Sequence, residues 1–191
     1  MESTVREDCV KDLETWLRDM IARPVPGGVA AAAVAAAMGA ALLAKAARAT
    51  MERQSLASAD QEKLKAAFGL AQAQSAELLR LASADEAAYQ MVLDTRLLAS
   101  QASARRQALR AASESPIRMA EACQTLLDSL SEISDLCWQD VRADLNAGCW
   151  LLEATVRICV LAAESNLRAG EVGSGAGSLQ GRIDALREGL N

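Results

Sequence analysis

The stretch that decides the fold is PVPGGVAAAAVAAAMGAALLA, residues 24–44. Its first five residues hold two prolines and two glycines, which end a preceding helix because proline disfavours helical backbone in the residue before it. From Gly27 to Ala44 the stretch has no charged residue and is mostly alanine, the best helix former. We therefore expect a break followed by a buried helix to about Met51, with side chains small enough for neighbouring backbones to come close.

A membrane span is the other interpretation of an uncharged helix. This stretch is short for a span, and alanine and glycine are weakly apolar compared with leucine or isoleucine. We therefore expect no membrane partner.

Helical periodicity continues on both sides of this stretch. Before it, Leu13, Trp16 and Met20 follow the three-and-four spacing of one helical face, which predicts a helix over 5–22. After it, the pattern predicts helices over 59–98, 103–112, 140–169 and 179–190. A further helix is expected to begin with Ser115 as N-cap and Pro116 at its first helical position.

These segments predict an all-α fold. We expect one up-and-down bundle of long antiparallel helices over residues 1–170, closed by Gly170 as C-cap. Residues 171–191 are expected to form a Gly-rich linker, centred on 173–177, and a short C-terminal helix. The small side chains of 27–44 cannot all face water, so we also expect a homodimer.

The composition argues against several classes of function. The net charge is −5 and no basic cluster occurs, so nucleic-acid binding is not expected. Histidine is absent, which removes the commonest general base and the commonest metal ligand, and we expect no metal and no cofactor. The five cysteines form no CxxC pair and the N-terminus is not a signal peptide, so reduced thiols and a cytoplasmic location are expected.

Asp85 is the most conspicuous polar residue. It shares an apolar line with Leu78, Leu81, Ala88 and Val92, where a carboxylate is costly to bury unless it is paired or used in catalysis. The other interpretation is an N-cap that restarts a helix after a kink.

The 140–169 segment has a narrow face that begins at Asp144, continues through Gly148 and Thr155, and ends at Asn166. Such a face either lines a pocket or packs closely against another helix. The residues alone leave both possibilities open.

Four motifs together resemble the cyclodeaminase/cyclohydrolase family of folate one-carbon enzymes. That family includes the cyclodeaminase domain of formiminotransferase-cyclodeaminase and the stand-alone methenyltetrahydrofolate cyclohydrolases. The motifs are Pro24-Val25-Pro26-Gly27-Gly28, Asp85-Glu86-Ala87-Ala88-Tyr89, Ser115-Pro116-Ile117, and Ala143-Asp144 with the late Asn166. They occur in the family's order over about Leu13 to Leu167, as in a divergent member.

The resemblance implies an all-helical dimer and a set of site residues. Asp85 is implied as the catalytic acid/base, with Asp144 as a second catalytic candidate. The residues implied in substrate binding are Pro26, Gly27, Gly28, Arg53, Tyr89, Gly148 and Asn166.

The implied reaction makes or breaks a C–N bond at a cationic amidinium or iminium carbon, with a tetrahydrofolate derivative as the small-molecule substrate. Methenyltetrahydrofolate cyclohydrolase and formiminotetrahydrofolate cyclodeaminase are the leading interpretations. The motifs also depart from the family: Val29 follows two glycines rather than three, and Arg53 stands where a lysine pair is usual. These departures leave two alternatives, a repurposed cyclase or ring-opening enzyme acting on a non-folate metabolite, and a non-catalytic helical binding protein.

Overall fold

The structure is a computed structural model that describes residues 2–53, 55–96, 102–170 and 176–190, and for residues 2–11, 102, 170 and 176 the helical backbone alone. Six α-helices make up almost all of these residues, and none of them is in a strand. The helices are α1 (Glu2–Ala22), α2 (Gly28–Arg53), α3 (Ser58–Thr95), α4 (Ala102–Ile133), α5 (Arg142–Gly170) and α6 (Ala176–Glu188). Two 3₁₀ turns, η2 (Ser134–Leu136) and η3 (Gln139–Val141), join α4 to α5.

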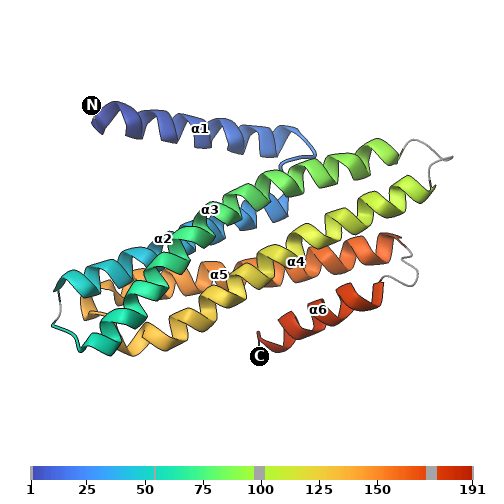
Figure 1. Ribbon diagram of the computed structural model, residues 1–191. Helices are drawn as coiled ribbons and strands as arrows, with labels where there is room; N and C mark the ends of the chain where they lie inside the picture. Colours follow the sequence, from blue (N-terminus) through green and yellow to red (C-terminus); the bar gives the residue numbers. More distant parts are fainter. Residues whose placement is uncertain (1, 54, 97–101, 171–175, 191) are drawn as a thin grey trace.

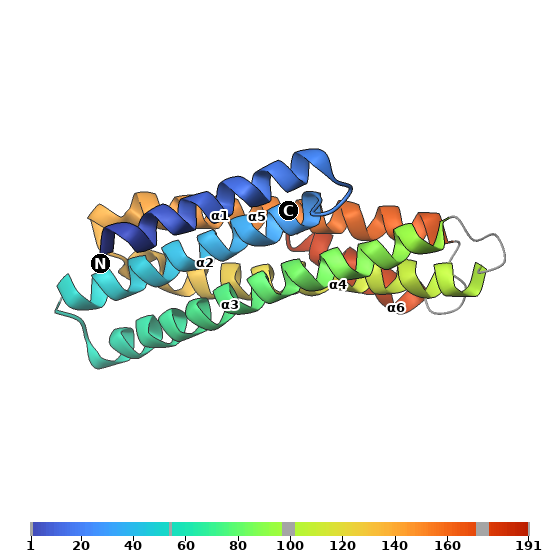
Figure 2. The same ribbon diagram turned by 90° about the horizontal axis from the view of Figure 1, so that it is seen from above.

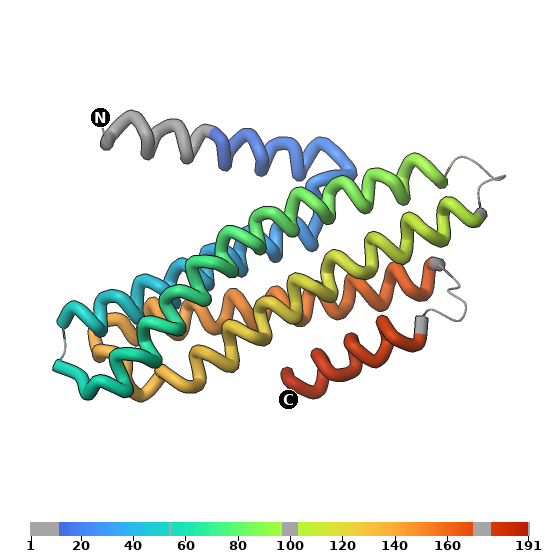
Figure 3. The backbone as a smooth tube through the Cα atoms, in the orientation of Figure 1, coloured from blue at the N-terminus to red at the C-terminus, as the bar shows by residue number. Residues whose placement is uncertain are grey.

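Helices α2 to α5 form the bundle. Successive helices run antiparallel and lie side by side, and α5 returns to pack against α2 (Figures 1 and 2). The backbone trace shows the same alternating path (Figure 3). The predicted all-α, up-and-down architecture is confirmed.

The helix predicted over 27–51 is the core helix of the bundle. It packs against both α3 and α5, and its inward positions are almost all alanine. At its crossing with α5, a Cβ on Gly148 would lie 2.8 Å from the Gly39 carbonyl oxygen, and a Cβ on Gly39 would lie 2.9 Å from the Gly148 oxygen. The two backbones are therefore in direct contact, which only a pair of glycines allows.

Two segments, α2 and Gln139–Ala169, are long and apolar enough to cross a membrane by length and composition alone. Core helices pass the same test, and 56% of the apolar window of α2 is buried within the bundle. The expected burial of α2 is therefore met by packing against other helices.

The prediction of a helix start at Ser115 was wrong. Residues 102–133 form one continuous helix with Pro116 inside it, so the separate short helix over 103–112 does not exist. Ser115 caps nothing, and its buried hydroxyl has no hydrogen-bond partner among the described residues. The helix tolerates proline because the side-chain amide of Asn166 bonds the Ala112 carbonyl, which proline leaves without a donor.

The C-terminal part differs from the prediction in extent. α5 ends at Gly170 as predicted, and 171–175 of the predicted linker lie outside the described residues. Ala176 and Gly177, also assigned to the linker, are the first residues of α6. α6 buries Leu179, Ile183 and Leu186 against the bundle.

An arginine fixes α6 to α4. The Arg182 guanidinium donates to both Glu121 oxygens at 2.6 and 2.7 Å and to Glu114 at 2.7 Å. The terminal helix is thus part of the same packed unit.

Figure 1 shows helix α1 standing apart from the bundle. Its Trp16 side chain packs against the core. The apolar residues Leu13, Leu17 and Ile21, which should face a core, are exposed. Exposed apolar side chains also occur on α2 and α5, at Met38, Trp150, Ile158 and Leu161. These two sets of side chains, which we call the uncovered apolar surface, are 40–88% exposed.

The glycine crossing gives a stability prediction. Gly148→Ala should lower the free energy of unfolding by about 1–3 kcal/mol, because the new methyl group must push two helix backbones apart. Gly69→Ala is the matched control, since a Cβ there meets nothing within 4 Å, and it should stabilise α3 by up to about 1 kcal/mol. Urea unfolding of the two variants measures both effects, and equal stabilities would contradict the crossing.

The uncovered apolar surface predicts self-association. We expect light scattering at micromolar concentration to give about twice the chain mass of 20.1 kDa. Trp150→Glu should shift the protein toward monomer, whereas Gln61→Glu, an equal change of charge at an exposed polar position of α3, should not. A monomeric wild type would disprove the dimer.

Candidate active site

Asp85 lies within α3, with Leu78, Leu81 and Val92 buried on the same helix. Its side chain is only 8% exposed. Because α3 is continuous from Ser58 to Thr95, the N-cap interpretation of Asp85 was wrong. The sequence correctly marked this carboxylate as one placed on an apolar helix face.

Burial dominates the electrostatics of Asp85. Desolvation, and to a smaller extent the neighbouring Glu86 carboxylate, raises the pKa of Asp85 from 3.8 to about 6. No described residue donates a hydrogen bond to it. The side chain can therefore both hold and release a proton close to neutral pH.

Helix α5 supplies a second titratable group next to Asp85. Burial, the neighbouring Cys123 thiol and the Asp85 carboxylate together raise the pKa of the Cys159 thiol well above its ordinary value. Cys159 therefore stays a neutral thiol beside the carboxylate.

The Pro-Gly break lies level with Asp85. The Ser75 hydroxyl of α3 donates to the Ala37 carbonyl of α2 at 3.0 Å, which fixes the register of the two antiparallel helices. Ten residues further along α3 is Asp85, and nine residues back along α2 is Gly28, the first residue of that helix. Figure 1 shows the start of α2 beside the second half of α3.

The residues implied by the first motif thus lie near Asp85. Pro26 is buried, Gly27 is half-buried and Gly28 is exposed. The Val25–Pro26 peptide bond is cis. The register of α2 and α3 therefore places the Pro-Gly break and Asp85 at the same level of the bundle.

Two more of the implied residues lie at this end. Tyr89 follows Asp85 by one turn, and its hydroxyl accepts a hydrogen bond from Arg96 at 3.4 Å. The Asn166 amide of α5 donates to the Ala112 carbonyl of α4 at 2.8 Å. The Asn166 side-chain amide therefore hydrogen-bonds within the protein.

The remaining implied residues lie toward the opposite end of the bundle. Asp144 forms an ion pair with Lys45 at 2.7 Å, and the Arg53 guanidinium lies over the Trp138 ring, 5.6 Å from its centroid. Along α2, Lys45 is 17 residues from Gly28, an axial separation of about 26 Å. A single chain therefore does not bring Asp144 and Asp85 to one small substrate.

Gly148 belongs to the packing arrangement. Its backbone contacts Gly39, so at this position the narrow face of α5 is a helix crossing rather than a pocket wall. Thr155 on the same face is 1% exposed, and its hydroxyl lies 2.9 Å from the Ala32 carbonyl of α2. Close packing explains this part of the face.

Sequence reasoning missed Lys45 and Trp138. Lys45 is the first charged residue after the uncharged run, a signal that could have paired it with a carboxylate on a neighbouring helix. The backbone N–H of Trp138 donates to the Thr50 hydroxyl at 3.0 Å, which ties the η2–η3 connection to the end of α2. No sequence spacing indicates that contact, because 88 positions separate the two residues.

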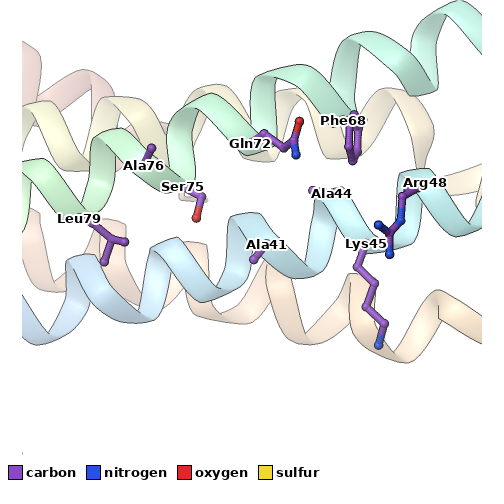
Figure 4. A pocket seen from close by; sticks show the side chains of 9 residues that line it. All are labelled: Ala41, Ala44, Lys45, Arg48, Phe68, Gln72, Ser75, Ala76 and Leu79. Atoms are coloured by element: carbon purple, nitrogen blue, oxygen red, sulfur yellow. The ribbon is translucent and has the colours of Figure 1, made fainter. Parts of the chain in front are cut away.

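Two surface grooves are also present. One, of about 480 Å³, lies between α2 and α3, with Phe68, Gln72 and Ser75 on one side and the cations Lys45 and Arg48 at its edge (Figure 4). The other, of about 670 Å³, lies between α3 and α4 and has acidic side chains at its rim, among them Glu62 and Asp128. Asp85 lines neither of them.

Comparison with known proteins decides the family. A family model described as formiminotransferase-cyclodeaminase matches residues 14–173. The chain belongs to this family. The resemblance inferred from four sequence motifs is thereby confirmed. No curated protein sequence matches the chain.

Solved structures support the same fold for this cyclodeaminase-family chain. The crystal structure of formiminotetrahydrofolate cyclodeaminase from Thermotoga maritima is similar, with a TM-score of 0.81 and 19% sequence identity. The match covers 91% of this chain and 87% of that one. At this identity the likeness shows the shared helical fold.

The raised pKa of Asp85 predicts how stability depends on pH. An aspartate with a pKa of 3.8 when unfolded and about 6 when folded binds its proton more tightly in the folded state. Its contribution to stability is therefore fully present below pH 3.8 and is lost as the pH rises to about 6, a total of about 3 kcal/mol.

Asp85→Asn removes this titration and nearly preserves the shape. Between pH 4 and pH 7 the variant should gain stability relative to the wild type by up to that amount, as measured by urea unfolding at each pH. A constant difference across this range would mean that the Asp85 carboxyl titrates alike in both states.

Proposed function

We propose that this protein is a folate-directed C–N cyclase or hydrolase, acting either as formiminotetrahydrofolate cyclodeaminase or as methenyltetrahydrofolate cyclohydrolase. Membership of the formiminotransferase-cyclodeaminase family and the shared fold support the general class. The observation that carries the proposal is Asp85, a buried carboxylate without a hydrogen-bond donor among the described residues and with a pKa of about 6.

The chemistry suits such a carboxylate. In the deaminase direction, a second folate nitrogen adds to the formimino carbon, ammonia leaves after protonation, and a cationic N–C–N methenyl bridge forms. In the hydrolase direction, water adds to that cation, loses a proton, and one C–N bond opens. Each direction needs one group that passes a proton and stabilises a cation, and a carboxylate does both.

The pKa of Asp85 suits a group that must act as both an acid and a base. A group that titrates at about 6 is present in both its acid and its base form near neutral pH. With no competing ion pair from the described residues, the carboxylate is available to a cationic substrate. Asp144, which is paired with Lys45, is less available.

The substrate side of the site is proposed to be the Pro-Gly break together with Tyr89. Gly27 and Gly28 carry no side chain that would obstruct the approach to Asp85, and the N-terminus of α2 begins there. An anionic folate tail would extend away from Asp85 toward the Arg48 guanidinium at the edge of the α2–α3 groove, because the Lys45 ammonium is already paired with Asp144 and Arg53 lies still further along α2.

A non-folate substrate is the second candidate. The observations that favour it are Val29 after only two glycines and the single Arg53, whose guanidinium already lies over Trp138. The reacting centre would still be a cationic amidinium or iminium carbon, so Asp85 keeps its role in either case.

Substitution of Asp85 tests the function. With 5-formiminotetrahydrofolate or 5,10-methenyltetrahydrofolate as substrate, Asp85→Asn should lower kcat by roughly a hundredfold or more, because the proton carrier is lost while the shape is kept. Absorbance of the methenyl group follows either direction.

Asp94→Asn is the matched control, an exposed carboxylate further along the same helix, and it should keep wild-type turnover. Near-normal turnover of Asp85→Asn would remove Asp85 from the mechanism. Absence of both activities in the wild type, with no binding of folate in a titration, would favour the non-folate substrate.

A further inference from the structure

Pro116 leaves one backbone carbonyl of α4 without its helical hydrogen bond. Proline has no backbone N–H, so the carbonyl of Ala112, four residues earlier, loses its helical donor. Both residues are buried, with Ala112 only 1% exposed, so water is a poor substitute. An unpaired buried carbonyl destabilises a fold, because it gives up its hydrogen bond to water without gaining another.

Asn166 supplies the missing donor from a different helix. Its Nδ2 lies 2.8 Å from the Ala112 oxygen, although the two residues are 54 positions apart. Asn166 is itself half-buried on α5. The hydrogen bond therefore ties α5 to the turn of α4 that the proline leaves incomplete.

That turn of α4 packs against the part of α3 that directly follows Asp85. Ala112, Ala108 and Leu109 form a small buried cluster with Val92 of α3, and Ala88 packs against it. Ala88 lies one turn after Asp85 on α3. A shift of the Ala112 turn would therefore be transmitted to the segment of α3 that carries the carboxylate.

We propose that Asn166 is a positioning residue, whose amide replaces the hydrogen bond removed by Pro116 and so holds the Ala112 turn of α4 against the Asp85 segment of α3. This role differs from the direct substrate contact that the family resemblance implied for Asn166. The link between Asn166 and Pro116 stands without the proposed function, and only its effect on turnover rests on that function.

A double-mutant cycle tests the link. Asn166→Leu, similar in shape but without a donor, should reduce the folding equilibrium constant by about tenfold or more in urea unfolding. Pro116→Ala restores the N–H that Ala112 needs, so in that background the same substitution should cost less than about threefold. Asn166→Ala is run in parallel, because a smaller side chain cannot overpack the site.

Thr155→Val is the matched control. Thr155 is on the same helix and its hydroxyl lies 2.9 Å from a carbonyl of α2, with no proline involved, so its loss should cost the same with and without Pro116. An Asn166 effect of equal size in both backgrounds would overturn the proposal. Selective rescue by Pro116→Ala supports it.

The titration of Asp85 tests the positioning itself. Carboxyl carbon NMR should place its midpoint near 6 in the wild type, with Glu86 on α3 and Cys159 on α5 as the titratable neighbours. In Asn166→Ala the midpoint should fall toward the ordinary range of an aspartate, because a loosened α4 admits water, and Pro116→Ala should restore it. An unchanged midpoint would overturn the positioning role, whatever the outcome of the turnover assay for Asp85→Asn.

Discussion

The backbone contact between Gly39 of α2 and Gly148 of α5 is the constraint on which the bundle depends. It brings two helices closer than any side chain would allow, and the alanines of α2 continue that close approach toward α3. Such packing leaves little volume for large side chains, which explains a core with few aromatics. It also fixes the axial register of α2 and α5, because Gly39 and Gly148 are the glycines inside these helices, whereas Gly28 and Gly170 are end residues.

A polar group buried in a core of this kind is destabilising unless it is hydrogen-bonded, and most of the buried polar side chains are. The hydroxyls of Thr50 and Ser113 each lie 2.8 Å from a carbonyl of their own helix, and Thr155 adds a contact across to α2. Ser115 and Asp85 are the exceptions: neither has a hydrogen-bond partner among the described residues, and of the two only Asp85 can carry a charge. Its cost is not offset by structure, which is the physical reason to assign it to chemistry.

The sequence could predict features that depend on neighbouring residues, but not contacts between segments far apart in the chain. The helices come from local periodicity, which is why α2, α3 and α5 were placed within a few residues. Asp85 was identified because a carboxylate on an apolar helix face is visible from spacing alone. The predicted helix start at Ser115–Pro116 was wrong because the hydrogen bond that Pro116 removes is replaced by Asn166 on another helix. No local sequence pattern indicates that contact. Lys45–Asp144 and Thr50–Trp138 were missed for the same reason, since both pairs join distant segments.

The position of the candidate site follows from unequal helix lengths. α3 runs for 38 residues and α2 for only 26, so α2 begins part-way along its neighbour. Beyond Gly28 the inward face of α3 loses the cover of α2, and Asp85 lies at that step. A carboxylate deeper in the bundle would be sealed from substrate, and one further out would be solvated and have an ordinary pKa. The step leaves Asp85 buried enough that its pKa is raised, and it places the carboxylate level with the two glycines of the Pro-Gly break. That break, which ends α1, sets the position of the step.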